Sequence, residues 1–90
     1  MRPTKEEMHE IVERSKALYE QGIRKQVETD ENIGKVIVID ALTGEYEIDD
    51  IGMKASARLR KRLSNPQLFS LRIGYKAEET LGGIRERNLA

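Results

Sequence analysis

The chain has 90 residues, of which 38% are hydrophobic, 4% aromatic and 36% charged, and its 16 basic and 16 acidic side chains cancel. A chain of this length forms one small domain with a thin core, and such domains commonly self-associate to bury more apolar surface. The lack of cysteine excludes disulfides, thiolate zinc sites and cysteine nucleophiles. No run approaches the roughly 20 apolar residues of a membrane span, and the first residues do not resemble a signal peptide, so we expect a cytoplasmic location.

The first predicted element is a long helix over residues 4–28. Thr4 and Glu7 have the spacing of a capping box, in which each side chain bonds the other residue's backbone N–H. Gly22 is the weak point of the helix interior. Apolar residues at three- and four-residue steps form the buried stripe: Met8, Ile11, Val12, Leu18, Tyr19, Ile23 and Val27.

Two strands follow, over residues 35–40 and 45–48. The β-branched run 36–39 favours a strand, and because its alternate side chains are all apolar, both faces of that strand must be covered. Gly44 suits a turn between the strands. In the second strand Tyr46 and Ile48 alternate with acidic residues, which predicts an outer strand with one solvated face.

A second helix is predicted over residues 50–64 and a third strand over 68–73. Asp49 or Asp50 would cap the helix, and Pro66 would stop it. The helix core stripe comprises Ile51, Ala55, Leu59 and Leu63. The alternating apolar residues of the third strand are Phe69, Leu71 and Ile73.

These elements predict an α+β fold, with a long N-terminal helix followed by ββαβ. Residues 1–74 would form the single domain, and residues 75–90 a mobile C-terminal tail. We expect a three-stranded mixed sheet in the order 2-1-3, with a right-handed crossover that makes the third strand parallel to the second. The second helix would cover one face of the sheet. The first helix, or a second copy of the chain, would cover the other, so that self-association completes the fold.

Charges are strongly sorted along the chain. Residues 35–50 carry one lysine and five acidic residues, whereas residues 51–74 carry six basic residues and no acid. Acids before the second helix and cations at its end complement the helix dipole. The acidic residues suit either a solvated sheet edge or a magnesium or calcium site, but their spacing matches no calcium loop, so we expect the edge and no metal or cofactor. They are Asp40, Glu45, Glu47, Asp49 and Asp50.

The basic residues are the strongest candidates for a functional surface. On a helix, four of them share a face opposite Ala55 and Leu59. That face suits an acidic protein surface, nucleic acid phosphates, or plain solvation. The predicted partner-binding residues are Lys54, Arg58, Lys61 and Arg62, together with Arg72 and Tyr75.

No catalytic residues are predicted. His9 is the only histidine and is expected on the charged side of the first helix. Because the chain has no second histidine and no cysteine, a metal site at His9 is not expected. The chain holds no glycine-rich dinucleotide motif and no Walker-type phosphate loop. We therefore do not expect an enzyme.

Several short motifs resemble a family of small uncharacterised proteins of the cyanobacterial type. The matching elements span about residues 30 to 87 and include "IGKVIVID", "TGEYEID", "RIGY" and a Gly-Gly pair. The ββαβ part is more distantly similar to modules of unknown function encoded beside retropepsin-like proteases or toxins. That resemblance implies an antitoxin-like or adaptor role and carries no catalytic residue.

The sequence thus predicts a self-associating protein-interaction module without catalytic activity. Its expected partners are itself, as a homodimer or higher oligomer, and a small protein encoded nearby, bound by the basic helix and the tail. The alternative is a nucleic-acid-binding regulator that uses the basic second helix. No membrane partner is expected.

Overall fold

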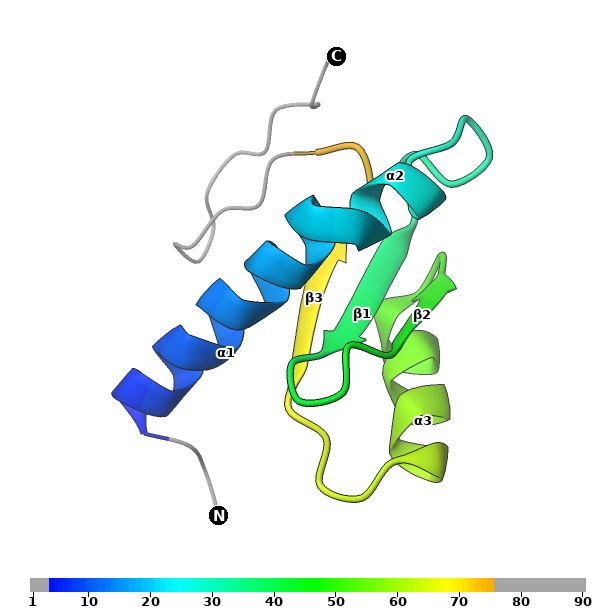
Figure 1. Cartoon of the computed structure of the whole chain (residues 1–90). Helices are drawn as coiled ribbons and strands as arrows, with labels where there is room; N and C mark the ends of the chain where they lie inside the picture. Colours follow the sequence, from blue (N-terminus) through cyan, green and yellow to red (C-terminus); the bar gives the residue numbers. More distant parts are fainter. Residues whose placement is uncertain (1–3, 76–90) are drawn as a thin grey trace.

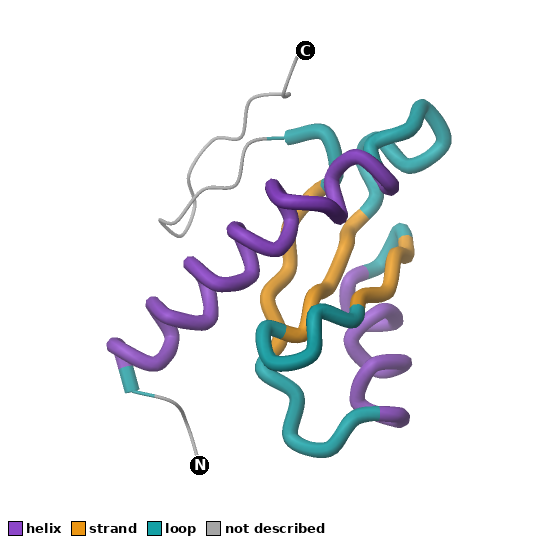
Figure 2. Tube along the Cα trace, in the orientation of Figure 1, coloured by secondary structure: helices purple, strands orange, loops and turns teal. Residues whose placement is uncertain are grey.

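The computed structural model describes residues 4–75 as a three-stranded sheet with helices on both faces, which is the predicted α+β fold (Figure 1). Of the tail predicted over residues 75–90, residues 76–90 lie outside the described residues. Within residues 4–75 no helix is both long and apolar enough to span a membrane. Figure 2 shows the elements by type. They are α1 (Lys5–Leu18), a π-helical segment (Tyr19–Ile23), α2 (Arg24–Val27), β1 (Val36–Asp40), β2 (Tyr46–Asp49), α3 (Gly52–Arg62) and β3 (Leu68–Arg72).

The sheet has the predicted strand order, β2-β1-β3. β1 pairs with both neighbours in the antiparallel sense, with Val38 opposite Glu47 on one side and Ser70 on the other. β2 and β3 therefore run in the same direction, as expected. The prediction of a mixed sheet was wrong, because β1 separates these two parallel strands and every adjacent pair is antiparallel.

The first helix begins where the sequence predicts. Thr4 Oγ1 accepts from the Glu7 N–H, and Glu7 Oε1 accepts from the Thr4 N–H, each at 3.1 Å, which completes the capping box. The helix is not uniform, however. The Arg24 N–H donates to the carbonyl of Tyr19, five residues earlier, so one wide turn interrupts it. Gly22, expected to be the weak point, lies in that turn.

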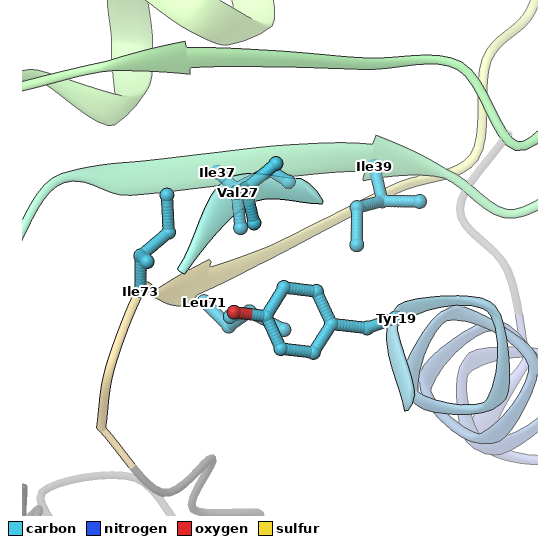
Figure 3. Packing of buried hydrophobic residues seen from close by; sticks show 6 residues of the cluster. All are labelled: Tyr19, Val27, Ile37, Ile39, Leu71 and Ile73. Carbon is cyan, nitrogen blue, oxygen red and sulfur yellow. The ribbon is translucent and has the colours of Figure 1, made fainter. Parts of the chain in front are cut away.

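α1, the π-helical segment and α2 together form the first helical layer, which covers one face of the sheet. Tyr19 lies over the strand residues of that face (Figure 3) and is only 5% exposed. Its hydroxyl donates to Glu28 Oε2 at 2.9 Å. The sequence left two ways to cover this face, the first helix or a second copy of the chain. In the structure the chain's own first helix covers it. The buried residues of this cluster are Tyr19, Val27, Ile37, Ile39, Leu71 and Ile73.

α3 covers the opposite face through a smaller cluster formed by Val38, Ala55 and Leu59, all fully buried. β1 is therefore covered on both faces, as its β-branched run predicts. Two details of α3 were predicted wrongly. Ile51 is 51% exposed and is not a core residue. Ile51 also occupies the N-cap position, while Asp49 Oδ1 accepts the Ile51 N–H from outside the helix.

Asp40 joins the turn after β1 to the loop before β3. It is 1% exposed, and one carboxylate oxygen accepts the Gln67 N–H at 2.8 Å while the other accepts the Thr43 hydroxyl at 2.8 Å. Burial alone would raise the pKa of Asp40, but these bonds, with those from the backbone of Leu42 and Thr43, outweigh burial and lower it. Asp40 is a structural carboxylate and does not lie on an exposed acidic edge.

Candidate interaction surface

The basic helix and the acidic strand contact each other directly. Arg58 donates from Nε to Glu47 Oε1 at 2.8 Å and from Nη1 to Asp49 Oδ2 at 3.1 Å. Its Nη2 also donates to the carbonyl of Ile48 at 2.9 Å. One guanidinium therefore bonds two carboxylates and the backbone of β2.

Arg62, one turn later, extends the same contact. Its Nε donates to Glu45 Oε1 at 3.0 Å, and its Nη1 donates to Glu47 Oε2. Glu47 thus lies between two guanidinium groups. We call the set Arg58, Arg62, Glu45, Glu47 and Asp49 the α3–β2 ion-pair network.

The network changes the acid–base properties of its carboxylates. Hydrogen bonds from Arg62 and then Arg58 hold the pKa of Glu47 below its ordinary value. The pKa of Asp49 is lowered first by the backbone N–H of Ile51 and then by Arg58. Both carboxylates are therefore charged at neutral pH, and they are held by cations of the same chain.

The structure shows which side chains the charged residues of both segments contact. Glu45, Glu47 and Asp49 do not form a merely solvated edge, because they pair with α3. Arg58 and Arg62 were predicted to bind a partner, but their guanidinium groups already bond β2. The cause lies in the sheet register: Glu47 lies opposite Val38, whose side chain packs against α3.

The predicted partner-binding residues do not form one surface. Lys54 lies close enough to Asp49 to lower the pKa of that carboxyl. Arg72 donates from Nη1 to the carbonyl of Gly34 at 2.6 Å, and the half-buried Tyr75 donates its N–H to the carbonyl of Arg72 at 3.2 Å. One of the six predicted residues, Lys61, lines a groove on the α3 side of the sheet.

That groove lies between α3 and β3 and encloses about 670 Å³. Its cations are Arg60 and Lys61, both exposed, and neither has an ion-pair partner among residues 4–75. Met53 is 83% exposed at its side. We call this the α3–β3 groove. Its lining residues are Val36, Gly52, Met53, Ser56, Ala57, Arg60, Lys61 and Ser70.

Sequence reasoning did not select Arg60. The signal was present, because Met53, Ala57, Arg60 and Lys61 are spaced at i, i+4, i+7 and i+8 and share a helical stripe. It was obscured because Lys61 was grouped on one face with Lys54, Arg58 and Arg62. In the structure α3 packs on β1 and β2, so its cations are divided between the β2 side and the open β3 side.

A second groove, of about 650 Å³, lies between α1 and β3 on the other face of the sheet. Met8, 54% exposed, and the half-buried Ile11 and Val12 supply its apolar wall. Phe69 and Ser70 line it from β3. We call it the α1–β3 groove.

Other candidate sites are less developed. The His9 Nε2 lies 3.7 Å from Glu13 Oε1, one turn away on the exposed side of α1. Within residues 4–75 no group of three or more histidine, aspartate or glutamate side chains is arranged to hold a metal ion. The α3–β3 groove, whose two cations have no ion-pair partner among residues 4–75, is therefore the favoured candidate for an interaction surface.

Comparisons with protein-family models, with curated proteins and with solved structures find no match to this chain.

Proposed function

We propose that this chain is a small protein-interaction module, adaptor or antitoxin-like in role, which binds an acidic segment of a partner protein in the α3–β3 groove. One observation carries the proposal: Arg60 and Lys61 stand exposed beside apolar side chains without an anionic partner among residues 4–75, whereas the neighbouring Arg58 and Arg62 are paired with β2.

The chemistry of the groove supports a protein ligand. Val36, Met53 and Ala57 offer apolar contact, and an exposed methionine adapts to differently shaped partners. Arginine and lysine at the rim attract carboxylates and steer an acidic partner toward the groove. A segment with apolar and acidic side chains would satisfy both properties at once.

The rival function, nucleic acid binding by the second helix, has less support. Phosphate binding depends on several cations presented together. Two of the four helix residues predicted for that role, Arg58 and Arg62, direct their guanidinium groups to carboxylates. Those carboxylates would also repel phosphates. Affinity capture with and without nuclease distinguishes RNA or DNA binding from protein binding.

The proposal has further parts that rest on the sequence. We place the protein in the cytoplasm, without catalytic activity of its own, and in the family of small proteins that its motifs resemble. Self-association into a homo-oligomer also stays a prediction. Its support is the thin core: among residues 4–75, the buried cluster on the α3 side consists of Val38, Ala55 and Leu59.

Affinity capture from a nuclease-treated lysate of the source cells tests the proposal. The bait is the full chain, compared with an Arg60→Glu/Lys61→Glu variant and with a matched control, Lys5→Glu/Lys25→Glu, which reverses two exposed charges on the first helical layer. We expect stoichiometric capture of one protein by the wild type and the control, and loss of capture by the groove variant. Circular dichroism must show all three folded.

Two results would contradict the proposal. Equal capture by all three baits would mean that the groove is not the contact. Capture that disappears with nuclease treatment, and returns with added RNA or DNA, would favour the nucleic-acid-binding function instead.

A further inference from the structure

β3 has one edge without a neighbouring strand among the described residues (Figure 1). The Ile73 N–H donates to the Lys35 carbonyl at 2.8 Å, and the Gln67 carbonyl accepts the Ala41 N–H at 2.9 Å. Successive residues of a strand direct their backbone groups to opposite edges. Leu68 and Ser70 therefore direct their N–H and C=O groups away from β1, toward the open edge.

The two grooves flank this edge, one on each face of the sheet. Ser70 lines both, so the grooves meet at the open side of β3. Figure 1 shows the N-terminal half of α1 extending beyond β3. The apolar residues of α1 that line the α1–β3 groove would cover one face of an additional strand there. A strand placed beside β3 would thus send alternate side chains into an apolar groove and into a groove with a basic rim.

The other edge of the sheet already shows which strand suits such surroundings. In β2, Tyr46 and Ile48 pack on the side of the first helix, while Glu47 and Asp49 bond Arg58 of α3. α3 therefore presents cations toward both edges: Arg58 and Arg62 toward β2, and Arg60 and Lys61 toward β3. The strand that occupies this side of β1, β2 itself, thus alternates apolar and acidic residues between the two helices.

We propose that β3 binds an extended segment of a partner protein as a fourth strand, and that this segment alternates apolar and acidic residues. The apolar side chains enter the α1–β3 groove, and the acidic ones reach Arg60 and Lys61. The inference rests on the proposed function and specifies its binding mode. Backbone hydrogen bonds to Leu68 and Ser70 supply affinity, while the two grooves supply specificity.

Charge selects this occupant over a second copy. A β3 strand from another molecule would present Leu68, Ser70 and Arg72 along one face. On the α3 face its arginine would add positive charge beside Arg60 and Lys61 instead of neutralising them. An acidic strand neutralises both cations.

The experiment uses a synthetic ten-residue peptide, Ac-SVEVEVEVES-amide, and a control peptide with lysine in place of glutamate. Binding to the full chain is measured by fluorescence anisotropy, and amide hydrogen exchange is followed by NMR. We expect the acidic peptide alone to bind, more weakly as salt rises, and to slow exchange at Leu68 and Ser70.

Two variants at one position test the strand geometry. Ser70→Pro removes the outward N–H without touching a bond to β1, as proline is tolerated on edge strands. It should weaken peptide binding about tenfold relative to Ser70→Ala, which keeps that N–H; this is the equivalent of a lost hydrogen bond with some misfit. Lys61→Glu should also weaken binding, and Lys25→Glu should not.

Several outcomes would overturn the inference. One is peptide binding without slowed exchange at Leu68 and Ser70; another is equal affinity for the Ser70→Pro and Ser70→Ala proteins. Slow exchange at both amides in the free protein would show that the edge is already paired, by a second copy or by residues 76–90. If cellular capture still depends on Arg60 and Lys61 in these cases, the proposed function stands and only the strand mode fails.

Discussion

Arg62 and Glu47 lie 15 residues apart in the chain and are joined by an ion pair that fastens the end of α3 to the edge strand β2. Arg58 makes the same connection one turn earlier. The sharp separation of acidic and basic segments along the chain therefore brings opposite charges together in the fold. Arg60 and Lys61, which line the α3–β3 groove without an ion-pair partner among residues 4–75, identify the surface that we propose for a partner.

The α3–β2 ion-pair network should contribute to thermal stability. Arg58→Ala and Arg62→Ala are each expected to lower the melting temperature at low salt, because carboxylates of β2 lose their cation. The network is solvent-accessible, so the loss should shrink near 1 M salt, where the screening length falls to about 3 Å. Scanning calorimetry measures both effects.

Lys61→Ala is the matched control for the network, since it removes a cation from the same helix without removing an ion pair described in residues 4–75. Its melting temperature should equal that of the wild type. If all three variants melted alike, the network would have no part in stability.

Asp40 should make stability depend on pH in the acid range. Its pKa is lower in the folded chain than the ordinary value of about 3.9, so its contribution is complete above about pH 4 and is lost as pH falls through the folded pKa. Asp40→Asn places an amide N–H₂ donor where a carboxylate oxygen accepts hydrogen bonds. It should lower the free energy of unfolding by about 1–3 kcal/mol at pH 7.

Urea unfolding at pH 7 and at pH 3 checks this. The difference in unfolding free energy between the wild type and the Asp40→Asn variant should be smaller at pH 3. A difference independent of pH would mean that the charge of Asp40 does not matter.

The α3 side of the core should be sensitive at its centre only. Leu59 is fully buried, and Leu59→Ala should reduce the free energy of unfolding by about 2–5 kcal/mol through lost burial and a residual cavity. Met53 is 83% exposed on the same helix, and Met53→Ala should change the free energy of unfolding by no more than about 0.5 kcal/mol. Chemical denaturation gives both values; similar losses would contradict the packing described.

Two glycines should respond to alanine in opposite directions. Gly74 has φ +86°, and a Cβ there would lie 2.7 Å from the Ile33 Cδ1, so Gly74→Ala should destabilise by about 1–2 kcal/mol. At Gly22 a Cβ meets nothing within 4 Å, and Gly22→Ala should stabilise the helix by about 0.5–1 kcal/mol. The midpoints of urea unfolding measure both changes in stability. A shift of the same sign in the two variants would contradict the expected difference between the two positions.

Most of the fold follows from periodicity. The three- and four-residue spacing of apolar side chains predicts the first helix, and the β-branched run of β1 predicts a strand covered on both faces. Strand order 2-1-3 follows from that double burial. The wide turn at Tyr19–Ile23 was not predicted, because its apolar residues keep a spacing that an ordinary helix also satisfies.

The candidate site was predicted only in part, for a physical reason. Helical spacing tells which side chains share a face of α3, but not where the helix lies across the sheet. In the structure α3 lies over β1 and β2, which brings Arg58 and Arg62 to the acids and leaves Arg60 and Lys61 beside β3. This lateral position depends on packing and on strand register, which no single element encodes.

The central claim is that Arg60 and Lys61 bind the partner, whereas Arg58 and Arg62 bind β2. Its most direct test is partner capture by four single variants, each checked for folding at the capture temperature: Arg58→Ala, Arg60→Ala, Lys61→Ala and Arg62→Ala. We expect Arg60→Ala and Lys61→Ala to capture less partner than the wild type, and Arg58→Ala and Arg62→Ala to capture as much. The reverse pattern, or equal loss in all four, would contradict the central claim.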